Sequence, residues 1–162
     1  MRTALLAALG LAGTIIAAPA MASDLSAPGI TIYSAEASID DVLLDISDAI
    51  VNRGYVVDYR SHVGEMLNRT AADVGADKTV YTAAVVTQFC SAVLSRKAME
   101  ADPVNLAFCP YGIFAFERAD KPGTVYVGYR QLVGNDTEAS KAALGEVNAL
   151  LDSIAKEAVG AE

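Results

Sequence analysis

The chain has 162 residues and is acidic, with 20 Asp and Glu residues against 12 Lys and Arg residues and a formal net charge of −8. Its basic residues form no cluster, and this pattern argues against binding to nucleic acid or to an anionic membrane surface. The length suits one domain, which can bury a core without needing a disulfide bond.

Residues 1–22 have the pattern of a secretory signal peptide. A short positive start precedes an uncharged run over 3–20, and Ala20-Met21-Ala22 supplies the small-x-small motif that a signal peptidase cleaves. A membrane-spanning helix is the competing interpretation, but Pro19 closes the run and no basic stop-transfer cluster follows. We therefore predict cleavage before Ser23, a periplasmic protein of net charge −9 (11 basic and 20 acidic residues), and no stable membrane insertion afterwards.

The remaining sequence predicts a short leader followed by alternating strands and helices. We expect the leader over 23–29, strands over 30–36, 55–60, 79–89, 113–117 and 124–130, and helices over 39–53, 61–72, 91–101 and from 136 or 137 onward. A turn over 119–123 joins the last two strands as a hairpin. This order predicts one α+β domain over 30–158, with a sheet of four to five strands and helices packed on one side.

The first helix has the clearest local pattern. Ser38 is a good N-cap, and Asp40 and Asp41 lie in the first turn, where the helix dipole favours negative charge. Apolar residues recur at three- and four-residue spacings through Ile50, and Gly54 suits the position just past the helix end.

The sequence contains none of the short motifs that mark common enzymes. It has no G-x-S-x-G, no phosphate-binding loop, no H-E-x-x-H and no C-x-x-C, and it has one histidine. These absences favour a non-catalytic protein and point to no particular cofactor.

The two cysteines, Cys90 and Cys109, are the first candidates for chemistry. Cys90 precedes Ser91, a good N-cap, so nearby helix N–H groups would lower its pKa. Cys109 follows the helix and its loop, and the two sulfurs could meet at one end of the sheet. Three interpretations stay open: a structural disulfide bond, two inert buried thiols, or functional redox thiols.

Two weaker sets of candidates accompany the cysteines. His62 and Met66 are four residues apart and, with a cysteine, would form the soft ligand set that suits copper or haem iron. The alternative places Met66 on an apolar stripe and His62 in solvent. Tyr111, Tyr129 and Arg130 could line a pocket, although tyrosines on strands are commonly sheet residues.

Several short motifs, in order, resemble the bacterial family called domain of unknown function 302. They are Arg53-Gly54-Tyr55, Met66-Leu67, Phe89-Cys90, Met99 to Pro103, Cys109-Pro110 and Val125-Tyr126-Val127, within residues 30–133. The resemblance implies a small sandwich with a twisted, mainly antiparallel sheet, association as a homodimer, and no established enzymatic activity.

The sequence and the resemblance together lead to two functional hypotheses. The first is an exported, non-catalytic binding or accessory module for an unidentified small ligand or protein, acting through the Cys90/Cys109 end of the sheet. The second is a thiol-redox, soft-metal or haem-binding protein that uses Cys90 and Cys109 with help from His62 and Met66.

Overall fold

A computed structural model describes residues 21–22 and 24–161 of the chain; residues 1–20 of the predicted signal peptide therefore lie outside the described part. The strands are β1 (Met21–Ala22), β2 (Ile30–Glu36), β3 (Val56–Ser61), β4 (Tyr81–Cys90), β5 (Tyr111–Arg118) and β6 (Lys121–Arg130). The helices are α1 (Ile39–Asn52), α2 (Val63–Thr70), α3 (Ala92–Ala101) and α4 (Glu138–Glu157), with short 3-10 helices η1 (Ala72–Val74) and η2 (Pro103–Phe108).

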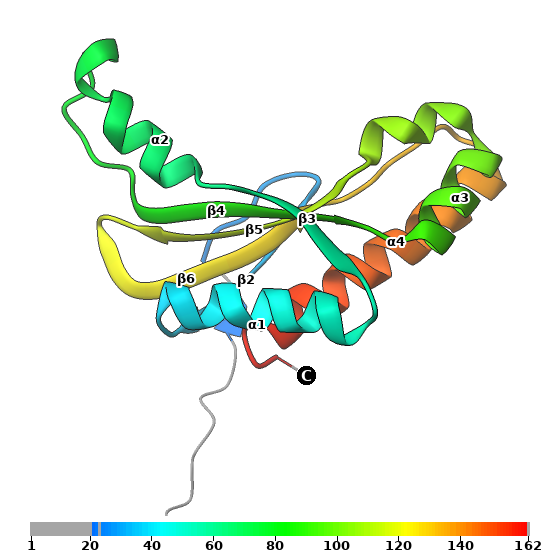
Figure 1. Cartoon of the computed structure of the whole chain (residues 1–162), viewed down its shortest axis with the longest axis horizontal. Coiled ribbons are helices and arrows are strands. Elements are labelled where there is room, and N and C mark those ends of the chain that lie inside the picture. Colours follow the sequence, from blue (N-terminus) through cyan, green and yellow to red (C-terminus); the bar gives the residue numbers. More distant parts are fainter. Residues whose placement is uncertain (1–20, 23, 162) are drawn as a thin grey trace, which may run out of the picture.

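The strands form one open antiparallel sheet in the order β1-β2-β6-β5-β4-β3. Helices α1 and α4 lie side by side on one face, α3 packs against α4, and α2 stands apart beside the start of β4 (Figure 1). This confirms the predicted α+β fold, with an antiparallel sheet of five full strands and with α1 and α4 packed on one side. No helix in the described part of the chain is both long enough and apolar enough to cross a membrane.

Helix starts follow the predicted capping residues in three cases out of four. The hydroxyl groups of Ser38, Ser91 and Thr137 each accept a hydrogen bond from a backbone N–H in the first turn of α1, α3 and α4. The predicted start of the second helix at residue 61 is wrong. Ser61 is the last residue of β3, and α2 begins after His62, whose side chain makes no capping hydrogen bond.

The hydrophobic core lies between the sheet and the layer formed by α1 and α4. Its helical residues recur at the spacing predicted from the sequence, and its strand residues alternate along β5 and β6. Members that are at most 1% exposed include Val42, Ile46, Ile50, Phe89, Ile113, Ala115, Val125, Val127, Leu144, Val147, Leu151 and Ile154.

A hydrogen-bonded cluster ties α4 to the sheet at the edge of this core. Asp152 of α4 accepts hydrogen bonds from the hydroxyl groups of Tyr33 (2.6 Å) and Tyr129 (3.3 Å), and it forms an ion pair with Lys156 (2.9 Å). Burial opposes ionisation of Asp152, but the hydrogen bonds from Tyr33 and Lys156 hold its pKa below the ordinary value.

The opposite face of the sheet has no helix layer over its central strands, and we call it the open face. Cross-strand partners share a face, so the pairing places on it Ile32, Val86, Gly112, Phe114, Phe116, Tyr126 and Gly128. The rings of Phe114 and Phe116 lie 6.0 Å apart, and those of Phe116 and Tyr126 lie 5.1 Å apart. An aromatic stripe therefore runs along the middle of this face.

The predicted leader folds back onto the open face. The carboxylate of Asp24 accepts hydrogen bonds from the Tyr126 hydroxyl (2.9 Å) and from the Lys121 ammonium (3.3 Å). These contacts cover Tyr126, which is fully buried although it belongs to the open face.

A substitution at Gly128 can test how tightly the aromatic stripe is packed. A Cβ at this position would lie 2.6 Å from Cζ of Phe114 and would also collide with the backbone oxygen of Thr31. We expect Gly128→Ala to lower the free energy of unfolding by about 3 kcal/mol, as overpacking typically does. The measurement is urea denaturation followed by circular dichroism.

The matched control is Gly145→Ala in α4, where a Cβ meets no atom within 4 Å. Alanine in a helix interior should raise the free energy of unfolding by about 0.5–1 kcal/mol. Equal effects at the two positions would contradict the packing described for the open face.

Candidate functional site

A pocket of about 260 Å³ lies on the open face at the end where the sheet meets Cys109, and we call it the thiol-end pocket. Most of its wall is apolar, and two residues that flank Cys109, Phe108 and Pro110, belong to it. The lining residues are Ile30, Val86, Gln88, Phe108, Pro110, Tyr111, Gly112, Phe114, Arg130 and Leu132.

Arg130 is the one charged residue among those that line this pocket. Its guanidinium forms no ion pair and no hydrogen bond with any residue in the described part of the chain. The amide of Gln88, on β4, is likewise without a side-chain hydrogen bond among the described residues. The pocket thus combines apolar walls with donor groups that no described protein group satisfies.

Two of the three predicted pocket residues, Tyr111 and Arg130, line the thiol-end pocket, and the third, Tyr129, lies elsewhere. Tyr129 points into the core, is 4% exposed and donates its hydroxyl to Asp152. The reason is strand alternation: neighbouring residues of β6 point to opposite faces of the sheet. Burial raises the pKa of Tyr129, which is consistent with a structural hydroxyl group.

The structure brings the two cysteines together at this end of the sheet as free thiols. The Cys109 sulfur lies 3.4 Å from Oγ of Ser95, and that oxygen lies 3.0 Å from the Tyr111 hydroxyl. Cys90, at the junction of β4 and α3, is close enough to Cys109 for the two thiols to influence each other's ionisation. Cys90, Ser95, Cys109 and Tyr111 therefore form a compact polar cluster, which we call the thiol cluster.

The expectation of a lowered pKa for Cys90 is wrong. Burial, and after it the neighbouring Cys109 thiol, together raise the pKa of the Cys90 thiol to about 11. The one opposing contact is a backbone hydrogen bond from Tyr111 on the adjacent strand. The first turn of α3 is instead capped by Ser91, whose hydroxyl group accepts from the N–H of Leu94. Cys90 is thus a protonated thiol at neutral pH.

The structure does not bring His62 and Met66 to the cysteines. His62 follows the end of β3, whereas Cys90 pairs with Val56 at the start of that strand. At about 3.3 Å per residue, the length of β3 separates them. His62 and Met66 are both exposed, and His62 lies 3.4 Å from Glu65. No group of three or more His, Cys, Asp or Glu residues in the described part of the chain is arranged to hold a metal ion.

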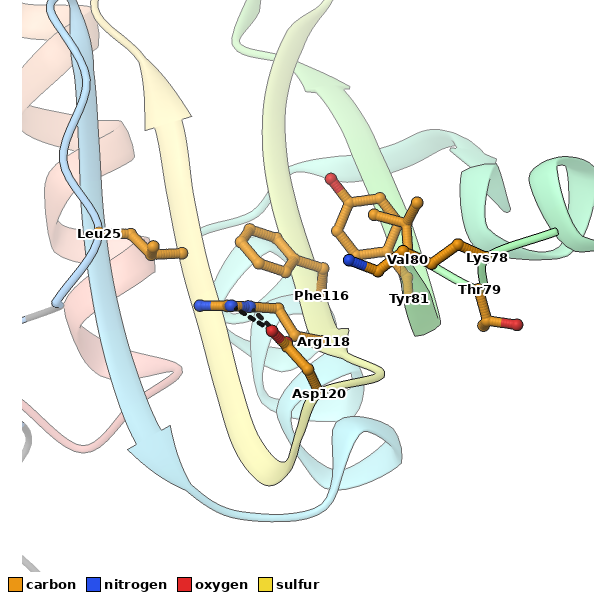
Figure 2. Close-up of a pocket in the computed structure, with 8 residues that line it drawn as sticks. All are labelled: Leu25, Lys78, Thr79, Val80, Tyr81, Phe116, Arg118 and Asp120. Atoms are coloured by element: carbon orange, nitrogen blue, oxygen red, sulfur yellow. Dashed lines mark hydrogen bonds and ion pairs between the residues drawn. The ribbon is translucent and has the colours of Figure 1, made fainter. Parts of the chain in front are cut away.

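A second pocket, of about 280 Å³, lies at the opposite end of the open face, and we call it the turn-end pocket. Figure 2 shows Phe116 at its centre, with Leu25 of the leader on one side and Tyr81 on the other. Its lining residues are Leu25, Lys78, Thr79, Val80, Tyr81, Phe116, Arg118 and Asp120.

The sequence did not point to the turn-end pocket, because its residues come from three separate segments. Leu25 belongs to the leader, Lys78 precedes β4, and Phe116 and Arg118 lie on β5. Lysine in a turn and arginine at a strand end are ordinary surface residues, so no local pattern marks them as a site.

Comparison with known proteins places this fold in a family. The family model for the domain of unknown function DUF302 matches residues 30–158. A crystal structure of an uncharacterized conserved DUF302 protein from Bacillus stearothermophilus matches with a TM-score of 0.68 and 15% identity, over 82% of this chain and 99% of that chain. At this identity the likeness shows a shared fold, and comparison with curated proteins finds no match. Because the family model spans the whole domain from β2 to the end of α4, the chain belongs to the DUF302 family.

Proposed function

We propose that the protein is an exported, non-catalytic binding domain that holds a small ligand in the thiol-end pocket. The observation that carries this proposal is Arg130, a guanidinium beside an apolar pocket with no ion pair to any described residue. A buried apolar wall with a few convergent polar groups is the usual composition of a ligand site.

The lining residues define the class of ligand. Phe108, Phe114 and the aliphatic side chains would contact an apolar body, while Arg130 and the Gln88 amide would bind an anionic or acceptor group. A pocket of about 260 Å³ lies just below the usual range for ligand sites, so the ligand is a small organic anion.

The same lining supports binding without catalysis. It contains no carboxylate, no histidine and no cysteine that could act as a nucleophile or a general base. Tyr111 belongs to the pocket wall, but its side chain points into the core, its hydroxyl lies 3.0 Å from Ser95, and burial raises its pKa to about 12.

Hexanoate is a suitable probe because it combines a short apolar chain with a carboxylate. In an NMR titration of the 15N-labelled protein, we expect hexanoate to shift the amide signals of Gly112, Phe114 and Arg130. We expect Arg130→Gln to weaken binding by about fivefold, which corresponds to about 1 kcal/mol for a partly exposed ion pair.

Arg96→Gln is the matched control, since Arg96 is exposed on α3 and outside this pocket. The control variant should bind hexanoate like the unaltered protein. Titration curves that are the same for all three proteins, or shifts confined to other surfaces, would refute the thiol-end pocket as the ligand site.

The proposal of export is supported by the N-terminal sequence pattern and by the position of the leader. Cleavage before Ser23 would remove only the two-residue strand β1 from the sheet and would keep Asp24, which binds Tyr126 and Lys121. The homodimer implied by the family resemblance and the unidentified protein partner stay predictions.

We expect the protein isolated from a periplasmic fraction to begin at Ser23, as measured by intact mass. Ala22→Asp should block processing, because the cleavage motif requires a small residue there. An unprocessed chain that remains with the cytoplasmic fraction would contradict export.

A second candidate function rests on the thiol cluster, in which Cys90 and Cys109 are neighbours. In an oxidising compartment the two thiols could exchange with an external disulfide. One internal S–S bond forms, the external S–S bond is reduced to two thiols, and the protons of Cys90 and Cys109 end on those leaving thiols. The raised pKa of Cys90 slows such exchange, so we propose a stable bridge rather than a cycling redox pair.

We expect the exported protein to contain no free thiol and to be less stable after reduction. Closing a loop of about 20 residues stabilises a fold by roughly 3 kcal/mol in the chain-entropy model. Urea denaturation of the oxidised and reduced protein measures the difference, and Cys109→Ser should match the reduced form under both conditions. Two free thiols in protein taken from the periplasm would exclude the bridge.

A further inference from the structure

We infer that the turn-end pocket is a second binding site, which takes a single-ring aromatic anion. This site is separate from the thiol-end pocket, so the inference does not depend on the proposed function. It rests on three features of the pocket: an aromatic floor, an excess of positive charge, and a wall supplied by the leader.

The floor of the pocket is aromatic. Phe116 contacts Tyr81 edge-on, with ring centroids 5.3 Å apart, and stacks on Tyr126 at 5.1 Å. Figure 2 shows Leu25 and Tyr81 on either side of the Phe116 ring. A flat ring that enters this space would meet Phe116 and Tyr81 in the offset or edge-to-face arrangements that aromatic pairs prefer.

The charged residues of the pocket carry a net charge of +1, from Lys78, Arg118 and Asp120, although the whole chain carries −8. The guanidinium of Arg118 donates two hydrogen bonds to the carboxylate of Asp120, from Nε to Oδ1 (2.8 Å) and from Nη2 to Oδ2 (2.6 Å). This contact holds the guanidinium in place beside the pocket and leaves donor hydrogens for a further acceptor.

Lys78 supplies the excess positive charge. Its ammonium forms no ion pair with any residue that the structure describes. Lys78 lines the same pocket as Tyr81 and Phe116, and in the view of Figure 2 its side chain extends past Tyr81 toward Phe116. An anionic group on the edge of a bound ring would therefore find Lys78 on one side and the fixed Arg118 on the other.

The leader closes one side of the pocket. Asp24 is anchored to Tyr126 and Lys121, and this anchor places the next residue, Leu25, in the wall. The volume of about 280 Å³ accommodates one ring with a small substituent rather than a larger ligand. The chemistry of the pocket suits a carboxylate or a phosphate equally, so the anion is the shared property and the experiment distinguishes the two.

Benzoate, phenyl phosphate and the neutral benzamide are the probes for an NMR titration of the labelled protein. We expect at least one of the two anions to shift the amide signals of Tyr81, Phe116 and Arg118. Benzamide should bind about fivefold more weakly, because it lacks the charge that a partly exposed ion pair needs. The affinity ratio of benzoate to phenyl phosphate identifies the preferred anionic group.

Lys78→Gln should weaken binding of the preferred anion by about fivefold and bring its affinity close to that of benzamide. Lys141→Gln on α4 is the matched control and should change nothing. Phe116→Leu should weaken all three probes alike, and its retained amide spectrum would show that the variant is folded.

Three outcomes would overturn the inference. They are equal binding of benzamide and both anions, an affinity that Lys78→Gln leaves unchanged, and binding that depends on Arg130 instead of Lys78. The last outcome would assign the aromatic anion to the thiol-end pocket and would leave the proposed function unaffected. Conversely, a failure of hexanoate to bind would refute the proposed function and would leave the inference about the turn-end pocket unaffected.

Discussion

The alternation of side chains along β5 is the constraint on which the rest of this structure depends. Tyr111, Ile113 and Ala115 point into the core beneath α1 and α4, whereas Phe114 and Phe116 point to the open face. A shift of one residue in the pairing would exchange the two sets. Because β5 is a central strand with neighbours on both sides, its register determines which residues the flanking strands place on each face.

This alternation gives the molecule two apolar surfaces but only one layer of helices to cover them. The second surface, the open face, is covered only in part, by two local contacts. The ring of Phe114 lies close against Gly128, where no side chain intervenes, and Asp24 brings the leader over Tyr126. Neither of these contacts covers the two ends of the aromatic stripe. A pocket lies at each end, beside an arginine. The pockets therefore follow from an α+β sheet with one helix layer and not from a motif in the sequence.

Much of the fold could be predicted because its signals are local. The stripe of α1 and the caps Ser38, Ser91 and Thr137 depend on residues three or four positions apart. The open face could not be predicted in this way, since both sets of β5 side chains are apolar. A strand that is apolar on both sides indicates burial on both faces, but its sequence does not say whether a helix, a leader or a ligand covers each one.

The candidate site, like the fold, could be predicted only where its properties depend on residues that are close in sequence. Because Cys90 precedes a helix N-cap, and helix N-termini lower the pKa of thiols, the sequence predicted a lowered pKa for Cys90. The side chain instead lies beside Cys109 and the backbone of Tyr111, because β4 pairs with β5 up to the residue before Cys90. Burial next to a second thiol then raises its pKa. The effect of a helix start on a thiol can be read from neighbouring residues, whereas the burial that overrides it here comes from the pairing of β4 with a strand distant in sequence.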